Sequence, residues 1–148
     1  MQAHPRLDCL SKETRVTATD RALLITNLAA QAAADKLATN IIALDVSDRL
    51  AITDVFLVCS AASDRQVRAV VDGIEGALDA IDLDPVRREG ERDGRWILLD
   101  YLDLVVHVQH VEERSFYGLE RLWKDCPLIE LPGIELPAPF ESDPIADA

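Results

Sequence analysis

The spacing of hydrophobic positions changes several times along the chain, and each change predicts a different element. Between Thr19 and Asn40 the apolar residues recur at near-helical spacing in an alanine-rich stretch, which predicts an amphipathic helix. Its expected stripe consists of Leu24, Leu28, Ala32 and Leu37. Two short apolar runs follow, IIALDV (41–46) and VFLVCS (55–60). Both are rich in β-branched residues and continuously apolar, so they predict strands buried on both faces.

A second helix is predicted from Ser63 to Ile81. Ser63 and Gln66 have the spacing of a capping box, in which serine is the N-cap and the glutamine side chain lies three residues later. Pro85 disfavours helical backbone at Asp84 and ends the pattern. One apolar stripe runs through the helix: Val67, Val70, Val71, Ile74, Leu78 and Ile81.

The third part of the chain predicts three strands and a closing helix. EGERDG (89–94) contains two glycines between strand-like runs, which is typical of a hairpin. WILLD (96–100) and LVVHVQHV (104–111) predict two further strands. ERSFYGLERLW (113–123) then predicts a helix that contains Gly118. Its expected stripe is Phe116, Leu119, Leu122 and Trp123.

The predicted order is α β β α β β β α, which indicates an α/β fold with a mixed five-stranded sheet flanked by helices. The polar stretch 1–17 is expected to be a loose N-terminal tail, and 18–127 to form one domain. The acidic, proline-rich stretch 128–148 is expected to be an extended C-terminal tail.

Composition narrows the functional classes. The 148 residues carry a net charge of −12, which argues against a general nucleic-acid binder. Such acidity either attracts a basic partner or only keeps the protein in solution. Cys9, Cys59 and Cys126 are widely spaced and form no CxxC pair, which favours a reducing, cytoplasmic location. No apolar run has the roughly 20 residues needed to span a membrane.

The segment from Trp96 to His110 contains the strongest candidates for chemistry. Asp100 and Asp103 are suited to holding Mg²⁺, but the alternative is that they bond backbone N–H groups of a tight turn. His107 and His110 are three residues apart on a strand and point to opposite faces, so they cannot chelate one metal ion. We therefore expect no catalytic residue, no metal site and no cofactor.

The same segment is a candidate interaction surface. Trp96, Leu98 and Tyr101 belong to a short, strongly apolar stretch, and Trp and Tyr dominate the binding energy of many interfaces. If helices cover only one face of the sheet, alternate residues of this strand must meet solvent or a partner. The alternative is a strand buried on both faces.

Three segments resemble the ribosomal silencing factor family, also called the Iojap family. They are DVSDRLAITDVFLVCSAASDRQV (45–67), REGERDGRWILLDYLDLVVHV (88–108) and ERSFYGLERLWKDCP (113–127). The resemblance implies an α/β domain related in fold to nucleotidyltransferases but without their catalytic motif. It also implies a cytoplasmic, non-enzymatic translational repressor. Such a repressor binds the fourteenth protein of the large ribosomal subunit and sterically blocks the small subunit during starvation or stationary phase.

The resemblance also assigns residues and partners. The family's contact segment matches Trp96, Leu98, Tyr101 and Asp103, so these are the expected partner-binding residues. Homodimers occur in the family, while a membrane or a directly read nucleic-acid sequence is not expected as a partner. The family commonly has glycine where this chain has Leu102, and a positive φ there would carry a steric cost for leucine. The enzymatic alternative is a cryptic nucleotidyltransferase that uses Asp100 and Asp103 with a divalent metal.

Overall fold

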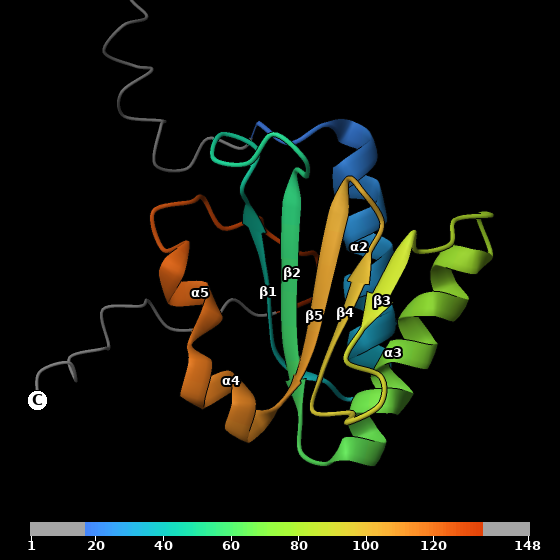
Figure 1. Ribbon diagram of the computed structural model, residues 1–148. Coiled ribbons are helices and arrows are strands. Elements are labelled where there is room, and N and C mark those ends of the chain that lie inside the picture. The colour runs from blue at the N-terminus through green and yellow to red at the C-terminus, as the bar shows by residue number, and fades with distance from the viewer. Residues whose placement is uncertain (1–16, 135–148) are drawn as a thin grey trace, which may run out of the picture.

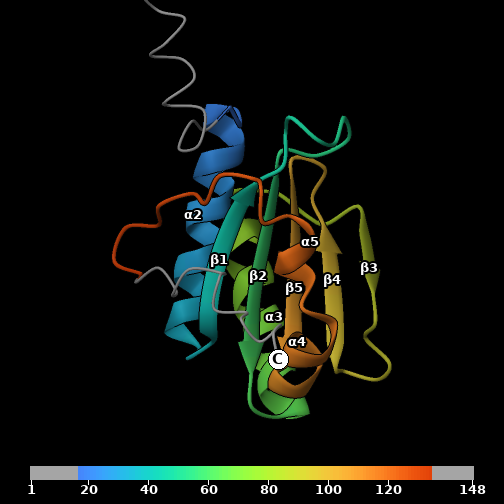
Figure 2. The same ribbon diagram turned by 90° about the vertical axis from the view of Figure 1, so that its left-hand side faces the viewer.

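A five-stranded mixed sheet organises the protein, which is seen here in a computed structural model that describes residues 17–134. Helices α2 and α3 cover one face, and the short helices α4 and α5 lie on the other (Figures 1 and 2). The elements in chain order are α2 (Asp20–Asp35), β1 (Thr39–Asp45), β2 (Val55–Ala61), α3 (Asp64–Asp79), β3 (Arg87–Glu89), β4 (Trp96–Asp100), β5 (Leu104–His110), α4 (Val111–Tyr117) and α5 (Leu119–Leu122). The predicted α/β class and the five-stranded mixed sheet are confirmed.

The strand order is β1-β2-β5-β4-β3, and only β2 and β5 run parallel among the described strands. The parallel pair lies at the centre of the sheet, where both faces are covered. β1 and β2 are almost fully buried, as their continuous apolarity predicted. The EGERDG hairpin is confirmed as the antiparallel pair of β3 and β4.

α3 follows its sequence pattern closely. Ser63 is the N-cap, and its hydroxyl accepts a hydrogen bond from the backbone N–H of Gln66 at 3.1 Å. The stripe from Val67 to Leu78 is buried against the sheet, as predicted. Ile81 was assigned to this stripe wrongly, because the helix ends at Asp79 and leaves Ile81 exposed.

α2 buries a different face from the one predicted. Leu24 and Leu37 are exposed, and Leu28 is only half-buried. The buried positions are Ala22, Ile25, Thr26, Ala29, Ala30 and Ala33. Mostly small side chains face inward, so the backbone of α2 can approach its neighbours closely, whereas leucine at these positions would hold it away.

The predicted helix over 113–123 is in fact two short helices. Gly118 has φ +52 and ψ +44, a left-handed conformation that ends α4 and starts α5. The change of direction separates the expected stripe, so that Phe116 and Leu122 are exposed while Leu119 and Trp123 pack on the sheet. A glycine in a helical pattern therefore marked a helix end here.

The first residues of the stretch 128–148 pack against the sheet. Ile129 donates its backbone N–H to the carbonyl of Ala43 at 2.8 Å, and Leu128 forms a bridge with Leu44. Ile129 and Leu131 are buried. This segment covers the outer edge of β1, which would otherwise present unpaired backbone groups. The rest of the expected tail, and all of 1–16, lie outside the described residues.

Candidate partner-binding face

β4 presents alternate residues to two different environments. Ile97 and Leu99 are buried beneath the helix layer of α2 and α3. Trp96 and Leu98 point to the opposite face, where they are half-buried. α4 and α5 lie over β5 and β2 on that face, which leaves β3 and much of β4 uncovered by helices (Figure 2).

Aromatic side chains gather on this second face. Neighbouring ring centres lie 4.9 to 6.0 Å apart, within the usual range for aromatic pairs. Five of the chain's seven Phe, Trp and Tyr residues take part, together with one histidine. We call this cluster the aromatic face; in spatial order it comprises Phe116, Tyr117, Trp96, His107, Phe56 and Trp123.

His107 holds the central indole of the aromatic face. The Trp96 Nε1–H donates to His107 Nδ1 at 3.1 Å, which fixes how the indole is presented. Burial lowers the pKa of His107 from 6.5 to about 4, so the imidazole is neutral at physiological pH. Its Nε2 is buried and has no partner among the described residues. Only one of its two ring nitrogens is therefore hydrogen-bonded within the described residues.

The exposed end of the aromatic face is formed by α4. Phe116 is 80% exposed and Tyr117 52% exposed, although each contacts another aromatic ring. Sequence reasoning assigned Phe116 to a buried helical stripe and did not consider Tyr117 as a site residue. The only sequence signal for their exposure was Gly118, where the helix break separates α4, which carries both rings, from α5.

Tyr101 lies apart from the other predicted site residues. It shares the parity of Ile97 and Leu99, so its ring is buried on the helix side and is only 3% exposed. Burial raises the pKa of its hydroxyl. The expectation that Tyr101 is an exposed contact does not agree with this position, since its ring supports the hairpin from within.

The turn between β4 and β5 uses its aspartates structurally. Asp100 accepts a hydrogen bond from the backbone N–H of Leu102 at 2.8 Å and pairs with Arg87 at 3.5 Å. Asp103 pairs instead with Arg21 at 3.3 Å, and this side chain is 41% exposed. The turn interpretation is confirmed for Asp100. Leu102, at the tip, has φ +74 and is 57% exposed, so the steric cost considered for this position is present.

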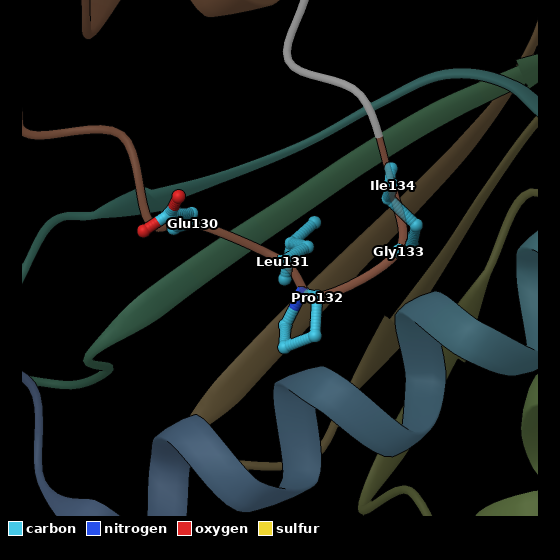
Figure 3. A pocket seen from close by; sticks show the side chains of 5 residues that line it. All are labelled: Glu130, Leu131, Pro132, Gly133 and Ile134. Carbon is cyan, nitrogen blue, oxygen red and sulfur yellow. The ribbon is translucent and has the colours of Figure 1, made fainter.

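Other groups that could carry chemistry are sequestered or dispersed. Burial raises the pKa of the Cys59 thiol to about 12, which keeps it protonated and unreactive. Within residues 17–134, no three His, Cys, Asp or Glu side chains converge as a metal site would require. A hollow of about 570 Å³ lies along Glu130–Ile134 and is lined by that single segment (Figure 3). No helix in the described part of the chain is long and apolar enough to cross a membrane.

Comparison with known proteins identifies the relatives of this fold. Residues 19–146 match the family model described as ribosomal silencing factor during starvation. The ribosomal silencing factor RsfS of Bacillus subtilis is 43% identical over 107 residues, covering 72% of this chain and 91% of that protein.

Two solved structures share the fold. A crystal structure from Bacillus halodurans matches with a TM-score of 0.65 and 37% identity, covering 76% of this chain and 100% of the other. One from Chromobacterium violaceum gives 0.68 and 30%, covering 80% and 98%. The family match spans most of the chain, and the relatives agree with it in sequence and in fold. The chain therefore belongs to the ribosomal silencing factor family.

Proposed function

We propose that this protein represses translation by binding the large ribosomal subunit through its fourteenth protein. Bound there, it sterically blocks the small subunit during starvation or stationary phase. The observation that supports this proposal best is the aromatic face, which remains open in a chain whose family is named for ribosome silencing. Large aromatic side chains on an open surface are typical anchors of protein interfaces.

Charge supports a basic partner. Glu112 and Glu113 are in the first turn of α4, the helix that carries Phe116 and Tyr117. Asp103 lies in the turn between β4 and β5, at the opposite end of β5 from α4. Ribosomal proteins are basic, and a chain with a net charge of −12 is attracted to them over a distance. The proposed contact residues are Trp96 and Leu98 at the centre and Asp103 at the rim. Tyr101 is reassigned to a supporting role beneath the turn.

Co-sedimentation with isolated large subunits tests the proposal. Trp96→Ala should weaken binding by about 2 kcal/mol, roughly thirtyfold, because it removes the central aromatic anchor. Leu24→Ala is the matched control, since it removes an exposed apolar side chain from α2 on the opposite layer. Cross-linking should join the wild type to the fourteenth protein, and adding the wild type should reduce the association of the two subunits.

Three outcomes would contradict this proposal. Failure of the wild type to sediment would exclude large-subunit binding. Equal binding by a folded Trp96→Ala protein, with circular dichroism as the folding check, would place the interface elsewhere. Normal association of the subunits in the presence of bound protein would exclude the steric mechanism.

An enzyme that uses Asp100 and Asp103 has less support. Asp100 is engaged by Leu102 and Arg87, and Asp103 by Arg21, so neither carboxylate is free to receive a metal ion without breaking these contacts. Stabilisation by ATP and Mg²⁺ in a thermal-shift assay, lost in Asp100→Asn, would favour this alternative.

A further inference from the structure

Half of the lysines and arginines among the described residues are neutralised by salt bridges within the fold. Six described arginines form salt bridges with described carboxylates. The cations without such a bridge among residues 17–134 are Lys36, Arg65, Arg68, Arg92, Arg121 and Lys124. Three of these, Arg65, Arg68 and Arg92, belong to one corner of the molecule, which we call the arginine corner.

The arginine corner joins the start of α3 to the loop between β3 and β4, which lie together in Figure 1. Arg68 donates from its Nη2 to the carbonyl of Arg92 at 3.2 Å. Its guanidinium also lies directly against Gly94, where an added Cβ would approach it to 2.7 Å. Arg65 is one helical turn before Arg68 and shares its helix face, and all three arginines are exposed.

The nearby carboxylates do not cancel this charge. Asp64 pairs with Arg95, and Glu91 pairs with Arg88. Asp93 in the loop and Asp72, one helical turn after Arg68, form no salt bridge with a described cation, so three unbridged arginines lie near two unbridged carboxylates. The guanidinium groups of Arg65 and Arg92 make no hydrogen bond or salt bridge with the described residues, so both are available to an external anionic ligand.

Arg95 fixes the arginine corner relative to the aromatic face. Its guanidinium contacts Asp64 at 3.6 Å, Glu112 at 2.8 Å and Glu113 at 2.9 Å. These contacts tie the first turn of α3 and the start of α4 to the residue that precedes Trp96. The arginine corner therefore has a fixed position beside the aromatic face, so a large partner bound on that face would also reach the corner.

We infer that the arginine corner contacts the phosphodiester backbone of the large subunit's RNA beside the protein bound on the aromatic face. This inference rests on the proposed function and adds a second class of partner to it. Planar guanidinium groups pair with phosphate oxygens in two-point contacts. Such contacts position a protein without reading the base sequence. They therefore agree with the expectation that this protein does not recognise a specific nucleic-acid sequence.

The first test uses two charge-matched double variants of the full chain. Arg65→Gln/Arg92→Gln and the control Arg49→Gln/Gln31→Glu each lower the net charge by two. The first double should weaken binding to large subunits about tenfold at low salt, and the slope of log Kd against log salt should lose about 1.5 in magnitude. The control double should bind like the wild type or slightly more tightly.

The sign of the change separates the alternatives. If the corner faces a basic protein, removing its arginines will tighten binding, and this would overturn the inference. If it faces only solvent, the two doubles will behave alike, which would also overturn it while leaving the proposed function intact. Failure of the wild type itself to sediment would instead contradict the proposed function, and the inference with it.

A second measurement identifies the chemical class of the ligand. An iron chelate attached to Arg92→Cys, in a Cys9→Ser background with Cys59 and Cys126 buried, generates hydroxyl radicals beside the corner. We expect cleavage of large-subunit RNA that the same chelate at Gln31→Cys does not produce. Weakened binding of the arginine double without this cleavage would indicate an acidic protein segment and would overturn the inference of RNA.

Discussion

Strands β4 and β5 give the two faces of the sheet different chemistry. On the helix side, β4 and β5 contribute aliphatic residues that are at most 1% exposed: Ile97, Leu99, Leu104, Val106 and Val108. On the other side, the same two strands contribute Trp96, Leu98, His107 and Gln109, which are half-buried or polar. The first face follows the rules of a dry core, and the second departs from them where a partner is proposed to bind. Departures of this kind are expected at functional surfaces.

The largest expected effect comes from placing the same polar group on the two faces of β4. Leu99→Asn leaves a cavity and buries an amide without partners, so it should cost about 4 kcal/mol of the free energy of unfolding. Leu98→Asn, one residue away, should cost only about 1 kcal/mol and should instead weaken binding to large subunits. Denaturant unfolding and co-sedimentation measure the two quantities. Similar unfolding free energies would show that the two faces are equivalent.

A smaller effect is expected from pH, through His107. Its pKa is about 4 in the folded protein against 6.5 for the exposed group, so the unfolded chain binds the proton more readily. The contribution to stability is intact above pH 6.5 and is lost as the pH falls towards 4, by on the order of 3 kcal/mol.

The variant His107→Phe isolates this contribution. Both proteins contain the same carboxylates, so only the difference between their unfolding free energies reports the histidine. The wild type should lose stability relative to His107→Phe between pH 6.5 and pH 4. A difference that does not vary with pH would mean that the imidazole is not desolvated on the aromatic face.

The smallest effects concern two leucines with left-handed backbone. Leu102 at the hairpin tip has φ +74, and Leu37 after α2 has φ +66. Glycine relieves this strain, so each Leu→Gly change should raise the midpoint of thermal unfolding, with a gain of up to about 1 kcal/mol. Leu37→Gly is the control for binding, because only Leu102 lies on the proposed contact hairpin. A loss of stability in both variants would contradict the idea that these leucines are strained.

Much of the fold could be predicted because its local signals agree with its packing. In α3, the N-cap serine and the apolar stripe both indicate the same buried face. In β4, whose first four residues are all apolar, the sequence left open whether both faces are buried, and the structure places Trp96 and Leu98 on the half-buried face opposite Ile97 and Leu99. In α2 the leucines and alanines both repeat at helical spacing, and the close approach of neighbouring elements selects the alanines.

The candidate site was predictable only in part, because its position depends on contacts between distant segments. The hydrogen bond from Trp96 to His107 joins two strands, and the aromatic face takes its other rings from β2, α4 and the end of α5. Tyr101 is buried because side chains alternate between the two faces, which puts it on the side of Ile97 and Leu99. This alternation was used for the two histidines in the sequence but was not extended to Tyr101. The arginine corner emerges only after the salt bridges of the other arginines have been identified.

The parallel pairing of β2 with β5 also determines when during synthesis the protein can fold. These central strands are separated in sequence by α3, β3 and β4, so the middle of the sheet cannot form until β5 has left the ribosome. Long-range pairing of this kind slows folding and makes it a late event. The aromatic face extends from Phe56 to Trp123, so it is completed later still. A growing chain of this protein thus cannot complete its proposed binding surface before Trp123 has left the ribosome.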